Sequence, residues 1–162
     1  MEHAFVLPPA PVHQLVGLLQ TLRQTQGRDD VWRLASSLGF TLVDLVPLLR
    51  AAALLGLVTL VEGDVTLTDA GRALARAGER RRRVLFRERL SALPVFRAAR
   101  DLLDRAAPDG ISRESMRERL AEAAGGLVSE ATLDTAIDWG RYAELFDYDA
   151  DTGRFLAGSV RR

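Results

Sequence analysis

The chain of 162 residues contains 22 Arg and neither Lys nor Cys, and its 22 acidic residues bring the formal net charge to zero. The absence of Lys excludes a P-loop lysine, a Schiff base and a lysine general base, and the absence of Cys excludes disulfides, thiolate metal sites and thiol nucleophiles. Apolar residues make up 48% of the chain, but no apolar run approaches the ~18 residues of a membrane span, and the first residues lack the pattern of a signal peptide. We therefore expect a cytoplasmic protein with no membrane span, which forms one domain or two small ones.

The first half of the sequence predicts three helices followed by a hairpin. Pro11 begins a leucine-rich helix that ends at Gln26-Gly27, and Gly39 and Gly56 end the next two helices. β-Branched residues on both sides of Glu62-Gly63-Asp64 predict a short hairpin, after which a fourth helix begins. This order is typical of a helix-turn-helix followed by a wing. The expected helix caps are Asp29 or Asp30, Thr41 and Thr68 in the first half, and Ser112 and Ser129 in the second.

The second half repeats this plan after a basic segment. Gly78 and the four Arg that follow Glu79 predict a boundary at which a linker helix begins, and Pro94 interrupts that helix. A Pro108-Asp109-Gly110 turn separates two later helices, and Ala150-Asp151-Thr152-Gly153 is the turn of a closing hairpin. We predict a mainly α fold with small β-hairpins, built from two tandem winged-helix units. The predicted domains are residues 1–78, a basic linker helix at 79–94, and residues 95–162.

Charge is distributed unevenly along the chain. Residues 1–78 carry six Arg against seven acids, residues 79–106 carry nine against four, and residues 107–162 carry seven against eleven. A basic middle and an acidic end attract each other, within one chain or between the two copies of a homodimer. Other candidate partners of the basic segment are nucleic acid, an anionic membrane surface and an acidic protein. The alternative is that the segment is a solvated linker helix without a binding role. Its arginines are Arg80, Arg81, Arg82, Arg83, Arg87 and Arg89.

The sequence offers no combination of residues that predicts catalysis. His3 and His13 have no metal-ligand spacing, and no Ser lies in a nucleophile context beside a histidine base. Asp147, Asp149 and Asp151 alternate along the closing hairpin, but the twelve-position calcium loop that ends in Glu is missing. We expect a non-enzymatic protein with no cofactor and no metal site.

Winged helices often bind DNA through the third helix, but neither candidate helix has suitable residues. Residues 41–55 contain one Arg among Leu, Val and Ala, and residues 130–144 contain four acids and one Arg. Contacts with phosphates and base edges need several Arg or Lys together with polar side chains. A DNA-binding transcriptional regulator that uses the arginine-rich helix is kept as the alternative function.

Aromatic residues are concentrated near the end of the chain. Spacing of three and four residues places Trp139, Tyr142 and Phe146 near one face of a helix. There they either pack in the core under the hairpin or, together with Arg141, form part of an interaction surface. We expect Trp32 to pack in the core of the first unit.

Several short motifs are similar to those of one protein family. They are Gly17-Leu18-Leu19, Asp30-Val31-Trp32-Arg33-Leu34-Ala35, Leu54-Leu55-Gly56, Glu62-Gly63-Asp64, Leu67-Thr68, Leu85-Phe86-Arg87-Glu88 and Leu93-Pro94. The most specific motif is Trp139-Gly140-Arg141-Tyr142-Ala143-Glu144-Leu145-Phe146, followed by Asp147-Tyr148 and Gly153-Arg154. In these residues the chain resembles the AAA-associated C-terminal domain attached behind the ATP-binding subunits of nitrate, sulfonate and bicarbonate type ABC transporters.

The resemblance implies a cytoplasmic accessory and regulatory module that works beside an ABC ATPase. The sequence departs from that arrangement because it contains no GxxxxGK[ST] segment, so it cannot hydrolyse ATP by P-loop chemistry. Three alternatives follow. The chain is a free-standing protein that acts in trans on a separate nucleotide-binding subunit, it has taken another partner, or it is a fragment of a longer chain.

Overall fold

The computed structural model describes residues 5–158. Over this part of the chain there are eight helices, which make up 60% of the structure, and the strands are short and antiparallel, so the fold is mainly helical with small sheets as predicted. In chain order the elements are α1 (Val12–Gln24), β1 (Arg28–Asp30), α2 (Val31–Leu38), α3 (Leu42–Leu54), β2 (Val58–Val61), β3 (Asp64–Leu67), α4 (Asp69–Arg76), α5 (Glu79–Ser91), α6 (Pro94–Ala106), β4 (Ile111–Ser112), α7 (Arg113–Ala124), α8 (Glu130–Tyr142), β5 (Phe146–Asp149) and β6 (Arg154–Ala157).

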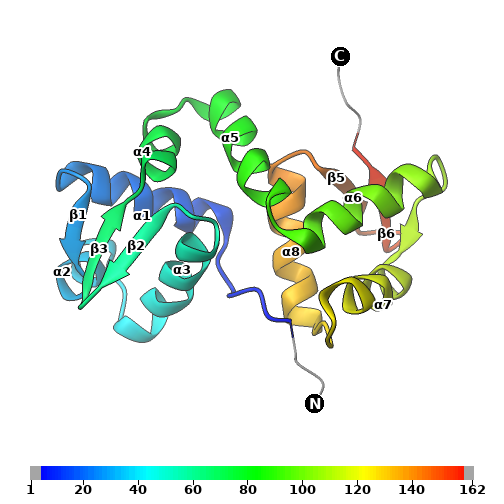
Figure 1. Ribbon diagram of the computed structural model, residues 1–162, viewed down its shortest axis with the longest axis horizontal. Helices are drawn as coiled ribbons and strands as arrows, with labels where there is room; N and C mark the ends of the chain where they lie inside the picture. Colours follow the sequence, from blue (N-terminus) through cyan, green and yellow to red (C-terminus); the bar gives the residue numbers. More distant parts are fainter. Residues whose placement is uncertain (1–4, 159–162) are drawn as a thin grey trace. The chain divides into compact units, whose positions relative to one another are not determined.

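The described residues divide into two units (Figure 1). The N-terminal unit comprises residues 8–86, and the C-terminal unit comprises residues 5–7 together with residues 87–158. The division falls inside α5, whereas the sequence placed a boundary at Gly78 and a linker helix at 79–94. Gly78 lies at the start of α5, where its carbonyl accepts a hydrogen bond from the Arg82 N–H at 2.8 Å.

In the N-terminal unit, leucines of α1 meet a small sheet and three further helices. The sheet has three antiparallel strands in the order β1-β3-β2, with Val65 of β3 opposite both Asp29 of β1 and Leu60 of β2. α1 contacts α2, α3, α4, β1 and β3, which makes it the central helix of the unit. Its buried side chains are Val12, Leu15, Leu18, Leu19 and Leu22.

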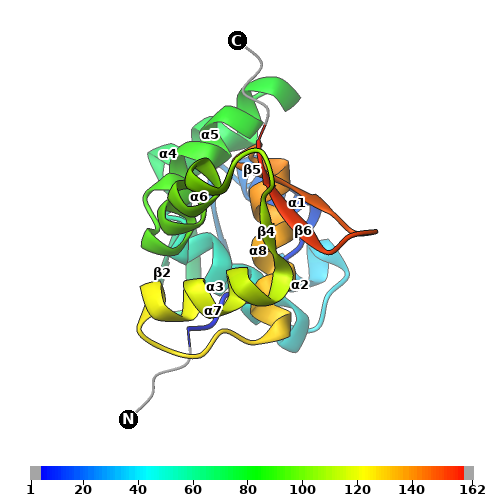
Figure 2. The same ribbon diagram turned by 90° about the vertical axis from the view of Figure 1, so that its right-hand side faces the viewer.

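The C-terminal unit repeats the order of elements, as the sequence predicts. Here α6, β4, α7, α8, β5 and β6 follow one another as α1, β1, α2, α3, β2 and β3 do in the first unit, and the sheet order β4-β6-β5 corresponds to β1-β3-β2 (Figure 2). The segment before α1 also belongs here, because the Phe5 N–H donates to the Leu127 carbonyl at 3.0 Å and the Leu7 N–H donates to the Thr132 hydroxyl.

Side-chain caps fix the helix starts in both units. Asp30 accepts a hydrogen bond from the Arg33 N–H at the start of α2, and Ser112 accepts one from the Ser115 N–H at the start of α7. Thr41 and Asp44 form a full capping box on α3, an arrangement that satisfies two backbone donors reciprocally. All the predicted caps are confirmed, with Asp30 rather than Asp29 at α2; the caps of α4 and α8 are Thr68 and Ser129.

The two tryptophans have opposite environments. Trp139 of α8 is fully buried and its indole stacks on Phe96 of α6, with ring centroids 6.2 Å apart. Trp32 is 71% exposed, so the prediction that it packs in the core of the first unit is wrong. Trp32 is the second residue of α2, and the buried side chains of that helix are Leu34 and Ala35. Around the helix, Trp32 lies about 160° from Leu34 and about 60° from Ala35, so it lies at the edge of the buried side rather than at its centre.

Within residues 5–158, no single helix is long and apolar enough to cross a membrane, although α2 and α3 pass a test of length and composition as a pair bent by 107°.

Candidate interaction surfaces

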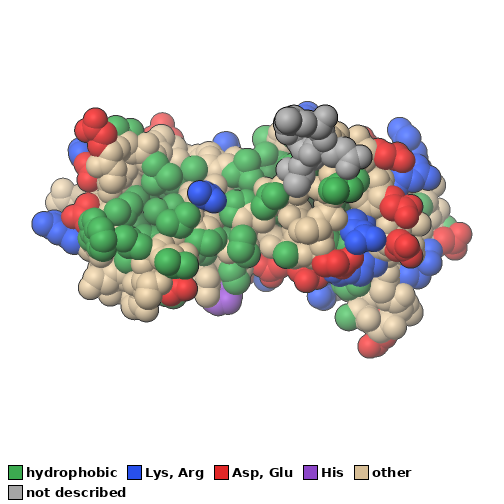
Figure 3. Space-filling view, turned by 90° about the horizontal axis from the view of Figure 1, so that it is seen from below, with side chains coloured by type: hydrophobic (Ala, Val, Ile, Leu, Met, Phe, Trp, Pro, Cys, Tyr) green, Lys and Arg blue, Asp and Glu red, His purple; other side chains and the backbone are tan. Residues whose placement is uncertain are grey.

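The N-terminal unit exposes apolar side chains on α2, α3 and β2. Val43 near the start of α3 is 81% exposed, and Val61 at the end of β2 is 64% exposed. α3 contacts both α2 and β2, and the Val31 N–H donates to the Gly63 carbonyl at 2.9 Å, which joins the start of α2 to the tip of the hairpin. Figure 3 shows hydrophobic side chains gathered on this side of the unit, in the left half of the view. We call this the apolar face; its large side chains are Trp32, Val43, Val46, Leu54, Leu60 and Val61.

α3 has two apolar sides, which explains why it contributes to both core and surface. Its inward side consists of Leu45, Leu48, Leu49, Ala51 and Ala52, all buried. The outward side carries Val43, Val46 and Leu54 where a solvated helix would carry charges. Arg50 lies on this side and forms no ion pair with any residue that the structure describes. Large contiguous apolar patches on a protein surface mark interaction sites. The sequence predicted the apolar third helix but missed the contributions of Trp32 and β2.

The arginine-rich helix α5 is only partly free to meet a partner. Arg82 donates to Glu79 at 3.0 Å and to the Ala77 carbonyl at 2.9 Å, and Arg83 pairs with Glu79 at 3.1 Å. Arg80 and Arg81 are exposed and form no ion pair with another described residue, while Arg89 is half-buried.

One arginine of α5 contacts the acidic C-terminal part of the chain. The Arg87 Nε donates to the Ala143 carbonyl at 2.6 Å, and its guanidinium pairs with Glu144 at 3.3 Å. The predicted attraction between the basic segment and the acidic end is therefore present within a single chain at this point. Among the arginines of α5, Arg80 and Arg81 are therefore the two that are exposed and form no ion pair with a described residue.

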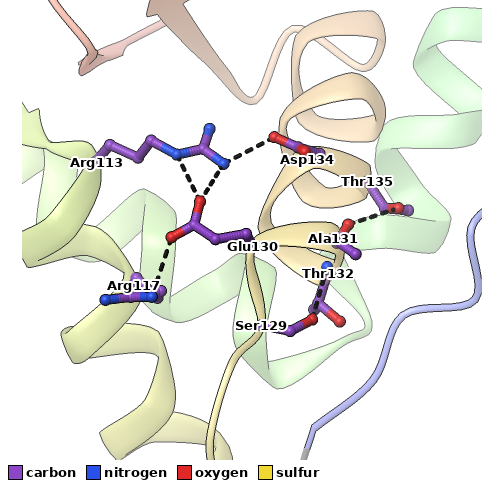
Figure 4. Close-up of polar contacts among 8 residues, drawn as sticks. All are labelled: Arg113, Arg117, Ser129, Glu130, Ala131, Thr132, Asp134 and Thr135. Atoms are coloured by element: carbon purple, nitrogen blue, oxygen red, sulfur yellow. Dashed lines mark hydrogen bonds and ion pairs between the residues drawn. The ribbon is translucent and has the colours of Figure 1, made fainter.

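Acidic residues of α8 are neutralised by arginines of α7 (Figure 4). Arg113 pairs with Glu130 at 2.6 Å and with Asp134 at 2.8 Å, and Arg117 pairs with Glu130 at 3.0 Å. Burial lowers the pKa of the Arg113 guanidinium, but hydrogen bonds with Glu130, Asp134 and Tyr148 outweigh burial and raise the pKa above its usual value. Two of the three acidic residues of α8, Glu130 and Asp134, thus form ion pairs with arginines of the same unit.

Replacing Arg113 by Gln is expected to lower the free energy of unfolding by about 1 kcal/mol, because the pairs are half-exposed and such pairs contribute little each. The difference should shrink in 1 M salt, where charges are screened within about 3 Å. Urea unfolding at low and high salt measures both effects. Arg97→Gln on α6, where Arg97 is exposed and forms no ion pair within the described chain, is the matched control. Equal losses in the two variants would contradict the assignment.

The residues considered for metal binding and catalysis lie apart. His13 is exposed on α1, and His3 lies outside the described residues. Asp149 accepts hydrogen bonds from the Asp151 and Thr152 N–H groups, so its carboxylate orders the hairpin turn. Between residues 5 and 158, no group of three or more His, Cys, Asp or Glu is arranged to hold a metal ion.

A family model described as the C-terminal AAA-associated domain matches residues 32–149 of the chain. The chain belongs to this family. A comparison of the chain with curated proteins found no match. The matched region of the AAA-associated domain starts at Trp32 and spans both units. The opening motif Gly17-Leu18-Leu19 and the closing pair Gly153-Arg154 lie outside it.

The motif Trp139–Phe146, on which the predicted resemblance mainly rested, forms the joint between α8 and the closing hairpin. Gly140 lets the Phe146 ring lie against the helix, since any side chain at this position would overlap that ring. The Leu145 N–H donates to the Gly140 carbonyl at 3.0 Å, and Glu144 adopts a left-handed conformation with φ of 57°. Phe146 then packs edge-on against Phe155 of β6, with centroids 5.3 Å apart. The motif therefore builds structure.

This placement corrects part of the predicted interaction surface. Trp139 is buried, so it belongs to the core, which was the first of the two alternatives. Tyr142 is half-buried at the end of α8, and Arg141 is exposed with Asp147 at 3.7 Å. Of these three residues, Arg141 is the one that is exposed.

Proposed function

We propose that this member of the AAA-associated domain family is a non-enzymatic, cytoplasmic accessory module that docks on the ATP-binding subunit of an ABC transporter and regulates it in trans. The observation that carries the proposal is the apolar face of the N-terminal unit. Its large side chains come from two helices and a strand of one folded unit. Burying apolar surface of this kind stabilises an interface by roughly 25 cal/mol per Å² before the entropic cost of association is subtracted.

We infer that each unit is a winged helix and that α3, the third helix of the N-terminal unit, contacts protein. The support for this inference is the order of elements: a helix, a short strand, two helices and a hairpin, with the first strand completing a three-stranded sheet. In this arrangement α3 holds the position of the usual recognition helix. The outward side of α3 carries Val43, Val46 and Leu54, which favours a protein surface over phosphates.

The rival function is a DNA-binding regulator that uses α5. Its support is limited to the exposed Arg80 and Arg81, because Arg82, Arg83 and Arg87 have partners within the chain. An electrophoretic mobility shift at near-physiological salt separates the two functions. A DNA binder should shift duplex DNA with a steep salt dependence, whereas the proposed module should leave it unshifted.

A pull-down with the cognate ABC transporter ATP-binding subunits tests the proposal directly. The immobilised chain should retain an ATP-binding subunit above the level of a variant with a scrambled apolar face. Failure to retain any subunit above that level would reject the proposal. Light scattering at low and high salt tests self-association in parallel, since a dimer held by opposite charges should dissociate as salt rises.

A further inference from the structure

A separate hollow in the C-terminal unit is lined by three arginines. Its volume is about 510 Å³, and its wall comes from α6, β4, the first two turns of α7 and β6, which are neighbours in Figure 2. The arginines are Arg105 from α6, Arg119 from α7 and Arg154 from β6, and no Asp or Glu is among the lining residues. The volume is within the range of about 300 to 1,000 Å³ that is typical of small-molecule sites.

No described carboxylate lies within ion-pair distance of the arginines that line this hollow. Arg105, Arg119 and Arg154 form no ion pair within the described chain, in contrast to Arg113 and Arg117 on the other side of α7. Asp101 and Glu122 line an adjoining hollow that shares Arg105 and Arg119, but no ion pair joins them to these arginines.

Arg154 is held in position by the backbone. Its Nε donates to the Asp109 carbonyl at 3.1 Å, and its Nη2 donates to the Gly110 carbonyl at 3.1 Å. A guanidinium has five N–H donors, so three of them stay available. Because both acceptors are neutral carbonyls, the full positive charge remains at the wall of the hollow. Arg154 is therefore an oriented cation with donors to spare.

The remaining lining residues suit an anion with an apolar or planar part. Ser112 and Ser115 bring hydroxyl groups from the start of α7, a helix end that carries partial positive charge. Leu102 and Ile111 supply apolar wall. Arginine forks match the oxygens of a phosphate group in geometry and charge.

We propose that this hollow binds a small ligand that carries a phosphate or pyrophosphate group. The site is distinct from the apolar face and lies in the other unit, so the proposal goes beyond docking and can fail independently of it. The ligand's anionic group meets Arg105, Arg119 and Arg154, and its remaining part lies against Leu102 and Ile111.

Calorimetric titration of the full chain with inorganic phosphate, pyrophosphate and ATP tests the proposal, with sodium chloride at equal ionic strength as the reference. We expect pyrophosphate or ATP to bind, and the double variant Arg105→Gln/Arg119→Gln to weaken that binding at least about tenfold, which corresponds to about 1.4 kcal/mol. The control is Arg97→Gln/Arg100→Gln, which removes two exposed arginines from α6 that line neither hollow. It should bind as the unmodified chain does.

Binding of pyrophosphate as tightly as ATP would assign the site to the phosphate group alone, and tighter binding of ATP would assign it to a nucleotide. The proposal is overturned if no probe gives more heat than the chloride reference. It is also overturned if the two double variants lose binding equally, or if Arg105→Gln/Arg119→Gln retains full affinity.

Discussion

Replacing Trp139 by Ala is expected to lower the free energy of unfolding by about 3 to 5 kcal/mol, the range found for Trp and Phe truncated in a core. The indole is fully buried and stacks on Phe96, so its removal forfeits both apolar burial and an aromatic contact and leaves a cavity. A loss of this size is a large fraction of the total stability of a typical domain, about 5 to 15 kcal/mol. Urea unfolding followed by circular dichroism measures it.

Trp32→Ala is the matched comparison, because it removes the same side chain from a position that is 71% exposed. We expect its effect on the free energy of unfolding to be within about 0.5 kcal/mol. Similar losses for the two variants would show that Trp32 is part of the core and would contradict the apolar face.

Replacing Gly140 by Ala is expected to destabilise the chain by about 1 to 3 kcal/mol, although Gly to Ala normally favours a helix. The added methyl group would overlap the Phe146 ring, which is buried between α8 and Phe155. The helix and the hairpin must then move apart, or the ring must leave its rotamer. Thermal unfolding of the variant gives the sign of the effect.

Gly17→Ala is the control, since Gly17 is also inside a helix and a methyl group there would meet no atom within 4 Å. We expect a gain of up to about 1 kcal/mol from helix propensity alone. A gain at both positions would mean that Phe146 does not pack on Gly140 as described. That result would remove the structural explanation of Gly140 in the motif Trp139–Phe146.

Local signals in the sequence were enough to place the helices. Caps such as Thr41 and Ser129 act on backbone groups two or three residues away, so a pattern of single residues reveals them. β1 and β4 were missed for the opposite reason. β1 consists of the charged residues 28–30 and has no β propensity of its own. It becomes a strand through pairing with β3, which lies more than 30 residues further along the chain.

For the candidate surfaces as well, the sequence predicted the local features but not those that depend on tertiary contacts. The sequence shows that α5 is basic and α8 acidic, but it cannot show that Arg87 contacts the Ala143 carbonyl or that Arg113 contacts Glu130. These tertiary contacts decide which charges remain available to a partner. The exposure of Trp32 did not follow from spacing alone, because Trp32 lies about 160° around α2 from buried Leu34 but about 60° from buried Ala35.

The apolar face is the central element of the proposed function, and one titration tests it most directly. The cognate ATP-binding subunit is titrated with the unmodified chain, with Val43→Glu/Val46→Glu, and with Gln20→Glu/Gln24→Glu. The second variant adds the same two negative charges at exposed positions of α1, a helix that contributes no residue to the apolar face. The account predicts that Val43→Glu/Val46→Glu weakens binding at least about tenfold and that the α1 variant binds as the unmodified chain does. Unchanged affinity in the Val43→Glu/Val46→Glu variant, or no binding by the unmodified chain, would contradict it.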